Sequence, residues 1–165
     1  NVAMEKGEVK EKFKIEAAKE TIDCLLQKKC KIALISHLGR PEGKRNPEFS
    51  LGQLAATAEK ILGVKIKFID DCIGDKVKKA LENITGKEVL LLENVRFYPG
   101  DEKNTFGFFK ELAEGFEIFI NDAFSASHRN HASVTGVAEI LPSFAGLRLQ
   151  KEIEEMEKIY QKVLD

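Results

Sequence analysis

The 165-residue sequence has no tryptophan, only three cysteines and four prolines, and no long apolar run. Its uninterrupted apolar stretches, such as residues 89–92, are far shorter than the roughly 20 residues that a helix needs to cross a bilayer. An apolar signal segment is also missing from the start of the sequence. We therefore expect no membrane partner and a cytoplasmic location.

A net charge is almost absent as well. The 26 lysines and arginines nearly balance the 27 aspartates and glutamates, which leaves a formal charge of -1. Such a chain has no overall electrostatic field to hold it on nucleic acid or on an anionic membrane. Any anion-binding site must therefore be local, and we expect no nucleic-acid partner.

Patterns that hold metals or nucleotides are missing too. Cys24, Cys30 and Cys72 lack CxxC spacing and companion histidines, so free, buried thiols in a reducing compartment are expected. His128 and His131 flank Arg129, but carboxylates at metal-ligand spacing do not accompany them. No Walker A, GxGxxG or GxSxG pattern occurs. We expect no metal and no cofactor in this sequence.

What the sequence does contain is a regular alternation of short apolar runs and amphipathic segments. Strands are expected at residues 31–36, 64–69, 88–93 and 116–120, and helices at 10–27, 50–62, 75–83, 104–114, 133–140 and 147–164. This order predicts an α/β fold, an open, doubly wound, Rossmann-like parallel sheet with helices on both faces. Polar residues precede the first helix, so the first strand of that sheet is predicted to be missing.

Basic side chains follow the ends of the predicted strands. His37 and Arg40 come after the first strand, Arg96 after residues 88–93 and Arg129 after residues 116–120. Ligands of such sheets bind beyond the carboxyl ends of the strands, and arginine grips phosphate or carboxylate through a fork of donors. The pattern favours a small phosphorylated acid as ligand. Solvated or ion-paired arginines, and a structural role for His37, are the alternatives.

Three segments in this order are highly specific: residues 36–41 (SHLGRP), 93–98 (ENVRFY) and 121–133 (NDAFSASHRNHAS). Together they resemble phosphoglycerate kinases, and the likeness extends from residues 1–2 to residues 141–146. It implies the N-terminal domain of a two-domain glycolytic phosphotransferase. That domain binds 3-phosphoglycerate or 1,3-bisphosphoglycerate, and the C-terminal domain binds Mg-ADP or Mg-ATP.

The resemblance also assigns roles by position. It makes Asn1, His37, Arg40, Arg96 and Arg129 substrate ligands, and the backbone of Leu38 and Gly39 completes the same loop. Lys14 stands where the family has an arginine that contacts the substrate and the transferring phosphoryl group. The resemblance makes Lys14 the catalytic and substrate-binding cation, but lysine keeps the charge without the fork, so weaker stabilisation of the transition state is expected. Ala3 replaces a family proline.

The domain boundaries implied by the resemblance are residues 1–146 for the substrate-binding domain and 147–165 for the start of the interdomain helix. The nucleotide domain is expected to be absent, so the chain is expected to bind 3-phosphoglycerate weakly and to turn over no ATP. Two other functions remain open: a stand-alone module that binds a phosphorylated acid without catalysis, and a structural or scaffold protein.

Overall fold

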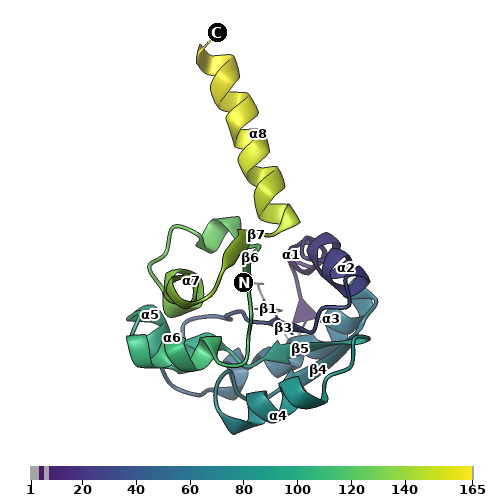
Figure 1. The fold of residues 1–165 in the computed structure, drawn as a ribbon, viewed down its shortest axis with the longest axis vertical. Coiled ribbons are helices and arrows are strands. Elements are labelled where there is room, and N and C mark those ends of the chain that lie inside the picture. The colour runs from purple at the N-terminus through teal and green to yellow at the C-terminus, as the bar shows by residue number, and fades with distance from the viewer. Residues whose placement is uncertain (1–3, 6–7, 165) are drawn as a thin grey trace.

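The computed structural model describes residues 4–5 and 8–164, and Figure 1 shows an α/β body from which one long helix projects. Its strands are β1 (Met4–Glu5), β2 (Glu8–Val9), β3 (Ile32–Leu34), β4 (Lys65–Ile69), β5 (Glu88–Leu92), β6 (Phe119–Asn121) and β7 (Ser143–Ala145). Its α-helices are α1 (Phe13–Glu16), α2 (Lys19–Gln27), α3 (Ala55–Leu62), α4 (Asp75–Asn83), α5 (Pro99–Glu102), α6 (Phe106–Ala113), α7 (Val137–Ile140) and α8 (Leu147–Leu164).

Short tight turns complete the described elements. Those in the 3₁₀ conformation are η1 (Pro47–Phe49), η2 (Leu51–Leu54), η3 (Val95–Phe97) and η4 (Phe124–Ala126), and η5 (Ala132–Gly136) is a π turn.

The centre of the fold is a parallel sheet with the strand order β3-β5-β4. In β5, Val89, Leu90 and Leu92 are completely buried, because apolar side chains leave both faces of this middle strand. The predicted strand at residues 88–93 is confirmed. Its burial on both faces explains why its sequence is an apolar run without alternation.

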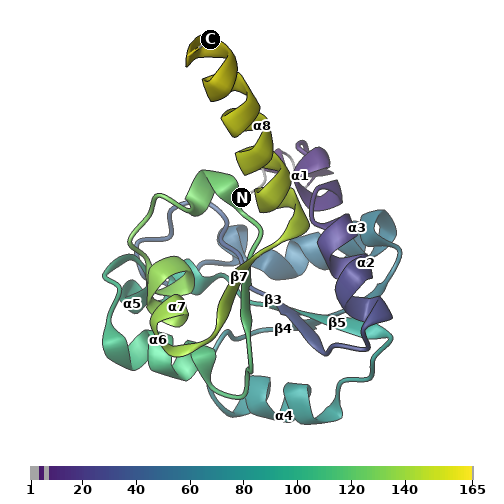
Figure 2. The same ribbon diagram turned by 45° about the horizontal axis from the view of Figure 1, so that its top comes forward.

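Helices cover both faces of this sheet, as Figure 2 shows. On one face, α2 and α3 contribute Ile22, Ala58 and Leu62 to a core with Val89 and Leu91. On the other face, α4, α6 and α7 pack against Leu90 and Leu92 in a second core. The predicted α/β class, with parallel strands and helices on both faces, is confirmed.

Several predicted boundaries were wrong. The single helix expected at residues 10–27 is α1 followed by α2, because the Ala18 N–H bonds to Ile15 O in a tighter turn between them. Strand β7 was missed because its three residues are all exposed and carry no apolar pattern. The helix expected at 133–140 begins as the π turn η5, where Gly136 packs directly against Phe109.

Other helix ends follow the sequence closely. Ser50 accepts a hydrogen bond from the Gly52 N–H and so caps the tight turn that leads into α3. Gly63 ends α3 in the left-handed conformation, at a φ of 70°. Helix α4 has the predicted bounds.

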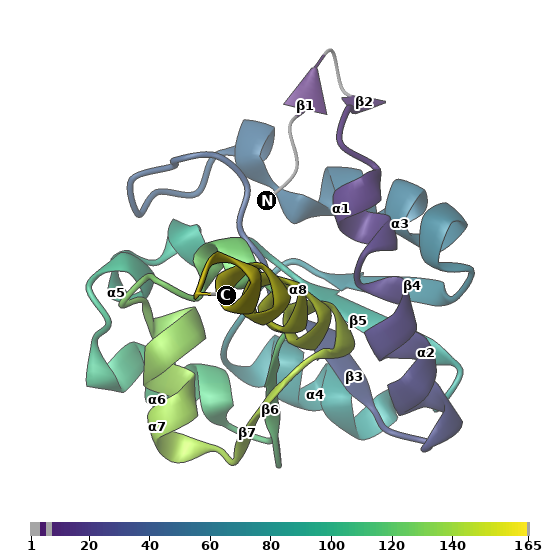
Figure 3. The ribbon, with the colours of Figure 1, turned by 90° about the horizontal axis from the view of Figure 1, so that it is seen from above.

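Strands β6 and β7 form a separate parallel pair on the β3 side of the central sheet (Figures 2 and 3). Helix α8 starts from this pair. Asp122 Oδ1 accepts hydrogen bonds from the N–H groups of Arg148 and Leu149, and Thr21 Oγ1 accepts one from the Leu147 N–H. Asp122 thus fixes the start of α8 to the loop after β6.

The remainder of α8 extends away from the body (Figure 1) and exposes Ile153, Met156, Ile159 and Tyr160. Within the described part of the chain, neither α8 nor any other helix combines the length and the apolar character that crossing a bilayer requires.

Candidate anion-binding site

The loop after β3 carries His37, Leu38, Gly39 and Arg40 to the carboxyl edge of the sheet. Leu38 is buried in the core on the α2 side, and Arg40 is exposed. Gly39 has a φ of 62°, and a Cβ there would lie 2.4 Å from ring atoms of Phe49. The loop therefore needs glycine for both its backbone conformation and its contact with Phe49.

We expect Gly39→Ala to destabilise the protein by about 1–3 kcal/mol, because it combines left-handed backbone strain with a steric clash. Gly86→Ala is the matched control, since Gly86 has no positive φ and a methyl group added to it would meet no atom within 4 Å. Urea unfolding of both variants measures the difference. Equal stability of the two variants would contradict the role assigned to Gly39.

Arg96 lies in η3, directly after β5, and its side chain is buried to 5% exposure. Its Nη1 donates a 2.9 Å hydrogen bond to Gly39 O, which ties it to the loop after β3. Its Nε lies 3.4 Å from Glu102 Oε1 but makes no hydrogen bond with any described residue. A buried guanidinium donor is thus left for another acceptor.

Glu93 and Asn94, at the end of β5, hold these loops in place. Glu93 accepts hydrogen bonds from Ser50 Oγ and from the N–H groups of Leu51 and Asn94, at 2.7–2.8 Å. Asn94 donates to Leu38 O and to Phe49 O, at 2.7 and 2.9 Å. Both side chains are buried, so the β3 loop and the segment before α3 share one rigid polar anchor.

Arg129 belongs to the loop that follows β6 and η4. Asp101, which is 1% exposed, accepts a hydrogen bond from the Ser133 N–H and lies 3.7 Å from His131 Nδ1. Asn104 donates to Asn130 Oδ1 at 2.8 Å. The residues on the C-terminal side of Arg129 are therefore fixed to α5 and to the turn after it.

Positive charge accumulates where these loops meet. Burial lowers the pKa of Arg96, and the neighbouring charges of Arg129 and Arg40 lower it further, against the opposite effect of Glu102 and Asp101. The charges of three guanidinium groups, from the loops after β3, β5 and β6, thus act on one another. We call the group of His37, Arg40, Arg96 and Arg129 the basic basin. It can accept an anion that carries more than one negative charge.

His37 takes part in the basin as a neutral group. Burial lowers its pKa to about 3, and the positive charges of Arg96, Arg129 and His131 add to this effect. At neutral pH the imidazole can therefore donate or accept a hydrogen bond without adding charge.

The depressed pKa of His37 predicts a pH dependence of stability. Below about pH 6.5 the unfolded chain protonates this imidazole, whereas the folded chain does so only near pH 3, so stability is lost as the pH falls through this window. From pH 6.5 to pH 5 we expect a loss of about 1 kcal/mol from His37 after allowance for solvent screening. Urea unfolding at both pH values should show this loss in the wild type but not in His37→Gln. The control variant His128→Gln, at an exposed histidine, should show the same loss of stability as the wild type. If His37→Gln also shows that loss, the assignment to His37 is contradicted.

The remaining predicted site residues are Lys14 and Asn1. Lys14 lies in α1, and its Nζ bonds to Glu11 Oε2 at 2.7 Å; its catalytic role stays a prediction. Asn1 and Ala3 lie outside the described residues.

Glu93, Asn94 and Asp101 were not recognised as supports of the site, although the position of the first two at the end of a buried strand was visible in the sequence. Among residues 4–5 and 8–164, no group of three or more histidine, cysteine or acidic side chains is placed to hold a metal ion.

Comparisons with known proteins agree on one family. A family profile described as phosphoglycerate kinase matches residues 1–164. A phosphoglycerate kinase of Bartonella tribocorum is 47% identical over 158 residues, which are 96% of this chain and 40% of that protein. One of Borreliella burgdorferi is 45% identical over 152 residues, or 92% of this chain and 39% of that protein.

Solved structures give the same result. Phosphoglycerate kinase from Pyrococcus horikoshii OT3 superposes with a TM-score of 0.85 at 27% identity, covering 97% of this chain and 41% of that one. Phosphoglycerate kinase from Coxiella burnetii superposes with a TM-score of 0.79 at 34% identity, covering 93% of this chain and 38% of that one. The chain thus spans about 40% of the length of the relatives that it matches.

Proposed function

Because this chain belongs to the phosphoglycerate kinase family, we propose that its basic basin binds 3-phosphoglycerate or 1,3-bisphosphoglycerate. The observation that carries the proposal is Arg96: a buried guanidinium whose Nε has no hydrogen-bond partner among the described residues, flanked by the charges of Arg40 and Arg129. A phosphate group of the ligand would satisfy that donor and offset the mutual repulsion of the arginines.

The loop after β3 would contribute amide N–H groups. The carbonyl oxygens of Leu38 and Gly39 already accept hydrogen bonds from Asn94 and Arg96, so they face protein donors. An anion needs donors, and the two carbonyl oxygens of the loop are already engaged by donors of the protein. Neutral His37 would add one further hydrogen bond to the same ligand.

In the reaction that we propose for the full enzyme, 1,3-bisphosphoglycerate and ADP give 3-phosphoglycerate and ATP. In the reverse direction the carboxylate of the acid is the nucleophile and needs no general base, so positioning and positive charge carry the catalysis. We propose that Lys14 supplies one such charge after it leaves Glu11. Mg-ATP or Mg-ADP would bind to a C-terminal domain, with α8 as the start of the connection, and no described group of side chains here fits Mg²⁺.

Calorimetry with the 165-residue chain tests the ligand. We expect 3-phosphoglycerate to bind at one site and glycerate, which has no phosphate, to bind at least tenfold more weakly, because the contacts with Arg96 are charge-assisted. Inorganic phosphate shows what the phosphate group contributes alone. Absence of both heat and thermal stabilisation with millimolar 3-phosphoglycerate would refute the proposal and would favour a scaffold role.

A turnover assay tests the second half of the proposal. With 3-phosphoglycerate, ATP and Mg²⁺, we expect the isolated chain to produce no ADP above the background of ATP hydrolysis. Measurable ATP-dependent phosphorylation would show that the chain is competent alone.

A further inference from the structure

Helix α5 packs against η3, which carries Arg96, and the charges of two acidic residues of α5 act on that arginine. Burial lowers the pKa of Arg96, and Glu102 and Asp101 oppose that effect. Asp101 is 1% exposed and accepts a 3.0 Å hydrogen bond from the Ser133 N–H. The side chain of Glu102 is 49% exposed. One counterion of Arg96 is therefore fixed inside the protein, and the other can turn into solvent.

The Glu102 carboxylate lies beside the Nε donor of Arg96 without satisfying it. Glu102 Oε1 is 3.4 Å from Nε, which is close enough for an ion pair, but Nε makes no hydrogen bond with a described residue. Within residues 4–5 and 8–164, no second ion pair or hydrogen bond holds the Glu102 side chain. Glu102 thus offsets the charge of Arg96 while the buried donor stays open to a better acceptor.

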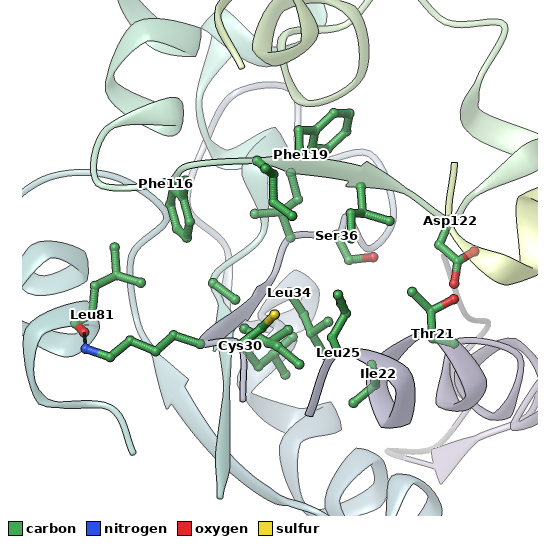
Figure 4. A pocket seen from close by; sticks show the side chains of 18 of the residues that line it. Thr21, Ile22, Leu25, Cys30, Leu34, Ser36, Leu81, Phe116, Phe119 and Asp122 are labelled. Atoms are coloured by element: carbon green, nitrogen blue, oxygen red, sulfur yellow. Dashed lines mark hydrogen bonds between the residues drawn. The ribbon is translucent and has the colours of Figure 1, made fainter. Parts of the chain in front are cut away.

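Arg96 itself is held firmly on the basin side of this pair. The preceding Val95 N–H donates to Ser36 O at 3.2 Å, and Ser36 comes two residues after β3 (Figure 4). The Arg96 N–H donates to Asn94 Oδ1 at 3.1 Å, and its Nη1 donates to Gly39 O at 2.9 Å. A rearrangement of the ion pair must therefore come from the carboxylate of α5 and not from the arginine.

The charges at the basin favour such a rearrangement when a ligand enters. The basic basin supplies three positive charges from its arginines, because His37 is neutral. An acid with one carboxylate and one phosphate group carries about 2.5–3 negative charges at neutral pH and so balances the arginines by itself. A further carboxylate 3.4 Å from Arg96 Nε would repel the phosphate that takes this donor. Glu102 and the ligand phosphate therefore compete for the same place.

We propose that Glu102 is a displaceable counterion, which compensates Arg96 in the empty basin, gives way to the phosphate group of the ligand and returns when the ligand leaves. This inference rests on the proposed function, since it concerns the same basin. It makes Glu102 a residue that lowers affinity and speeds release, while it stabilises the empty protein by pairing with a buried charge. The opposite role, a lasting support that holds Arg96 in the complex, would make Glu102 necessary for binding.

Glu102→Gln in the 165-residue chain distinguishes these roles, because the amide keeps the size of the side chain and removes its charge. We expect 3-phosphoglycerate and inorganic phosphate to bind at least threefold more tightly in calorimetry, and 3-phosphoglycerate to dissociate at least threefold more slowly. Without ligand, the melting temperature should fall by about 1–4 °C, because Arg96 loses a counterion. Tighter binding together with lower stability is the result that a purely structural role would not give.

Glu111→Gln is the matched control, because it removes the same charge from an exposed glutamate in α6. It should change affinity less than about twofold. A double-mutant cycle adds Arg96→Ala, in whose background Glu102→Gln should gain less than twofold. Such a cycle assigns the gain to the ion pair and not to the overall charge.

The outcomes separate this inference from the proposed function. If 3-phosphoglycerate binds the wild type and Glu102→Gln equally, or binds the variant more weakly, the counterion role is overturned and the proposed function stands. If 3-phosphoglycerate binds neither protein, the proposed function fails, and inorganic phosphate decides: tighter binding to Glu102→Gln alone supports the counterion. Equal binding of inorganic phosphate to the wild type, Glu102→Gln and Glu111→Gln, or no binding to any of them, overturns it.

Discussion

Glu93→Ala should destabilise the protein by about 3–5 kcal/mol, because three donors lose their acceptor and a cavity remains in the core. Glu93 is 4% exposed, and its donors are Ser50 Oγ and the N–H groups of Leu51 and Asn94. For a chain of this size we expect the melting temperature to fall by about 6–20 °C. Thermal and urea unfolding followed by circular dichroism measure both quantities.

Two comparisons separate this effect from a general sensitivity to lost carboxylates. Glu48→Ala removes an exposed glutamate from the neighbouring loop and should change stability by less than about 0.5 kcal/mol. Glu93→Gln keeps one acceptor oxygen, so its loss of stability should lie between those of Glu93→Ala and Glu48→Ala. Equal stability of Glu93→Ala and Glu48→Ala would show that the anchor at the end of β5 does not hold the loops.

Arg96→Ala should weaken the binding of 3-phosphoglycerate by about 10- to 150-fold, the range expected from a lost charge-assisted hydrogen bond of about 1.5–3 kcal/mol. The substitution removes the buried guanidinium donor and also its bond to Gly39 O. Arg96→Lys restores the charge without the planar fork, so it should recover only part of the affinity. Calorimetric titration of each variant gives the dissociation constants.

Arg45→Ala is the control for this series. Arg45 carries the same charge in the loop after β3, but its guanidinium bonds to Asp70 O and lies over the Phe97 ring. Its removal should change affinity less than about twofold, as expected for an exposed charge. If Arg45→Ala weakens binding as much as Arg96→Ala does, the ligand responds only to overall charge, and the basin is not its site.

Much of the fold was accessible from the sequence because its signals were local. The apolar run of β5, the cap at Ser50 and the left-handed Gly63 that ends α3 each act within a few residues of the chain. Strand β7 was missed because it is set by a partner distant in sequence. Its residues are exposed, and only pairing with β6 makes them a strand. The break between α1 and α2 was missed because helical periodicity continues through it.

The candidate site shows the same difference between local signals, which the sequence reveals, and contacts between distant residues, which it does not. The arginines were found because each lies in the segment that follows an apolar strand, and parallel topology brings such positions together. The neutral state of His37 was not visible, since it depends on burial and on charges from two separate loops. Nor was the anchoring by Glu93 and Asn94, which hold Ser50 and Leu38 across more than 40 residues of the chain. Lys14 was assigned by resemblance alone, and its bond to Glu11 makes it the residue most in need of direct measurement.

The central claim, that the basic basin is the binding site for a phosphorylated acid, can be tested most directly by nuclear magnetic resonance. In a titration of the ¹⁵N-labelled chain with 3-phosphoglycerate, we predict saturable shifts of the backbone amides of Leu38, Gly39 and Arg40 and of the Arg96 Nε–H. The signals of Arg45 should stay in place. Saturable shifts that leave the amides of residues 38–40 and the Arg96 side chain unchanged would contradict the assignment.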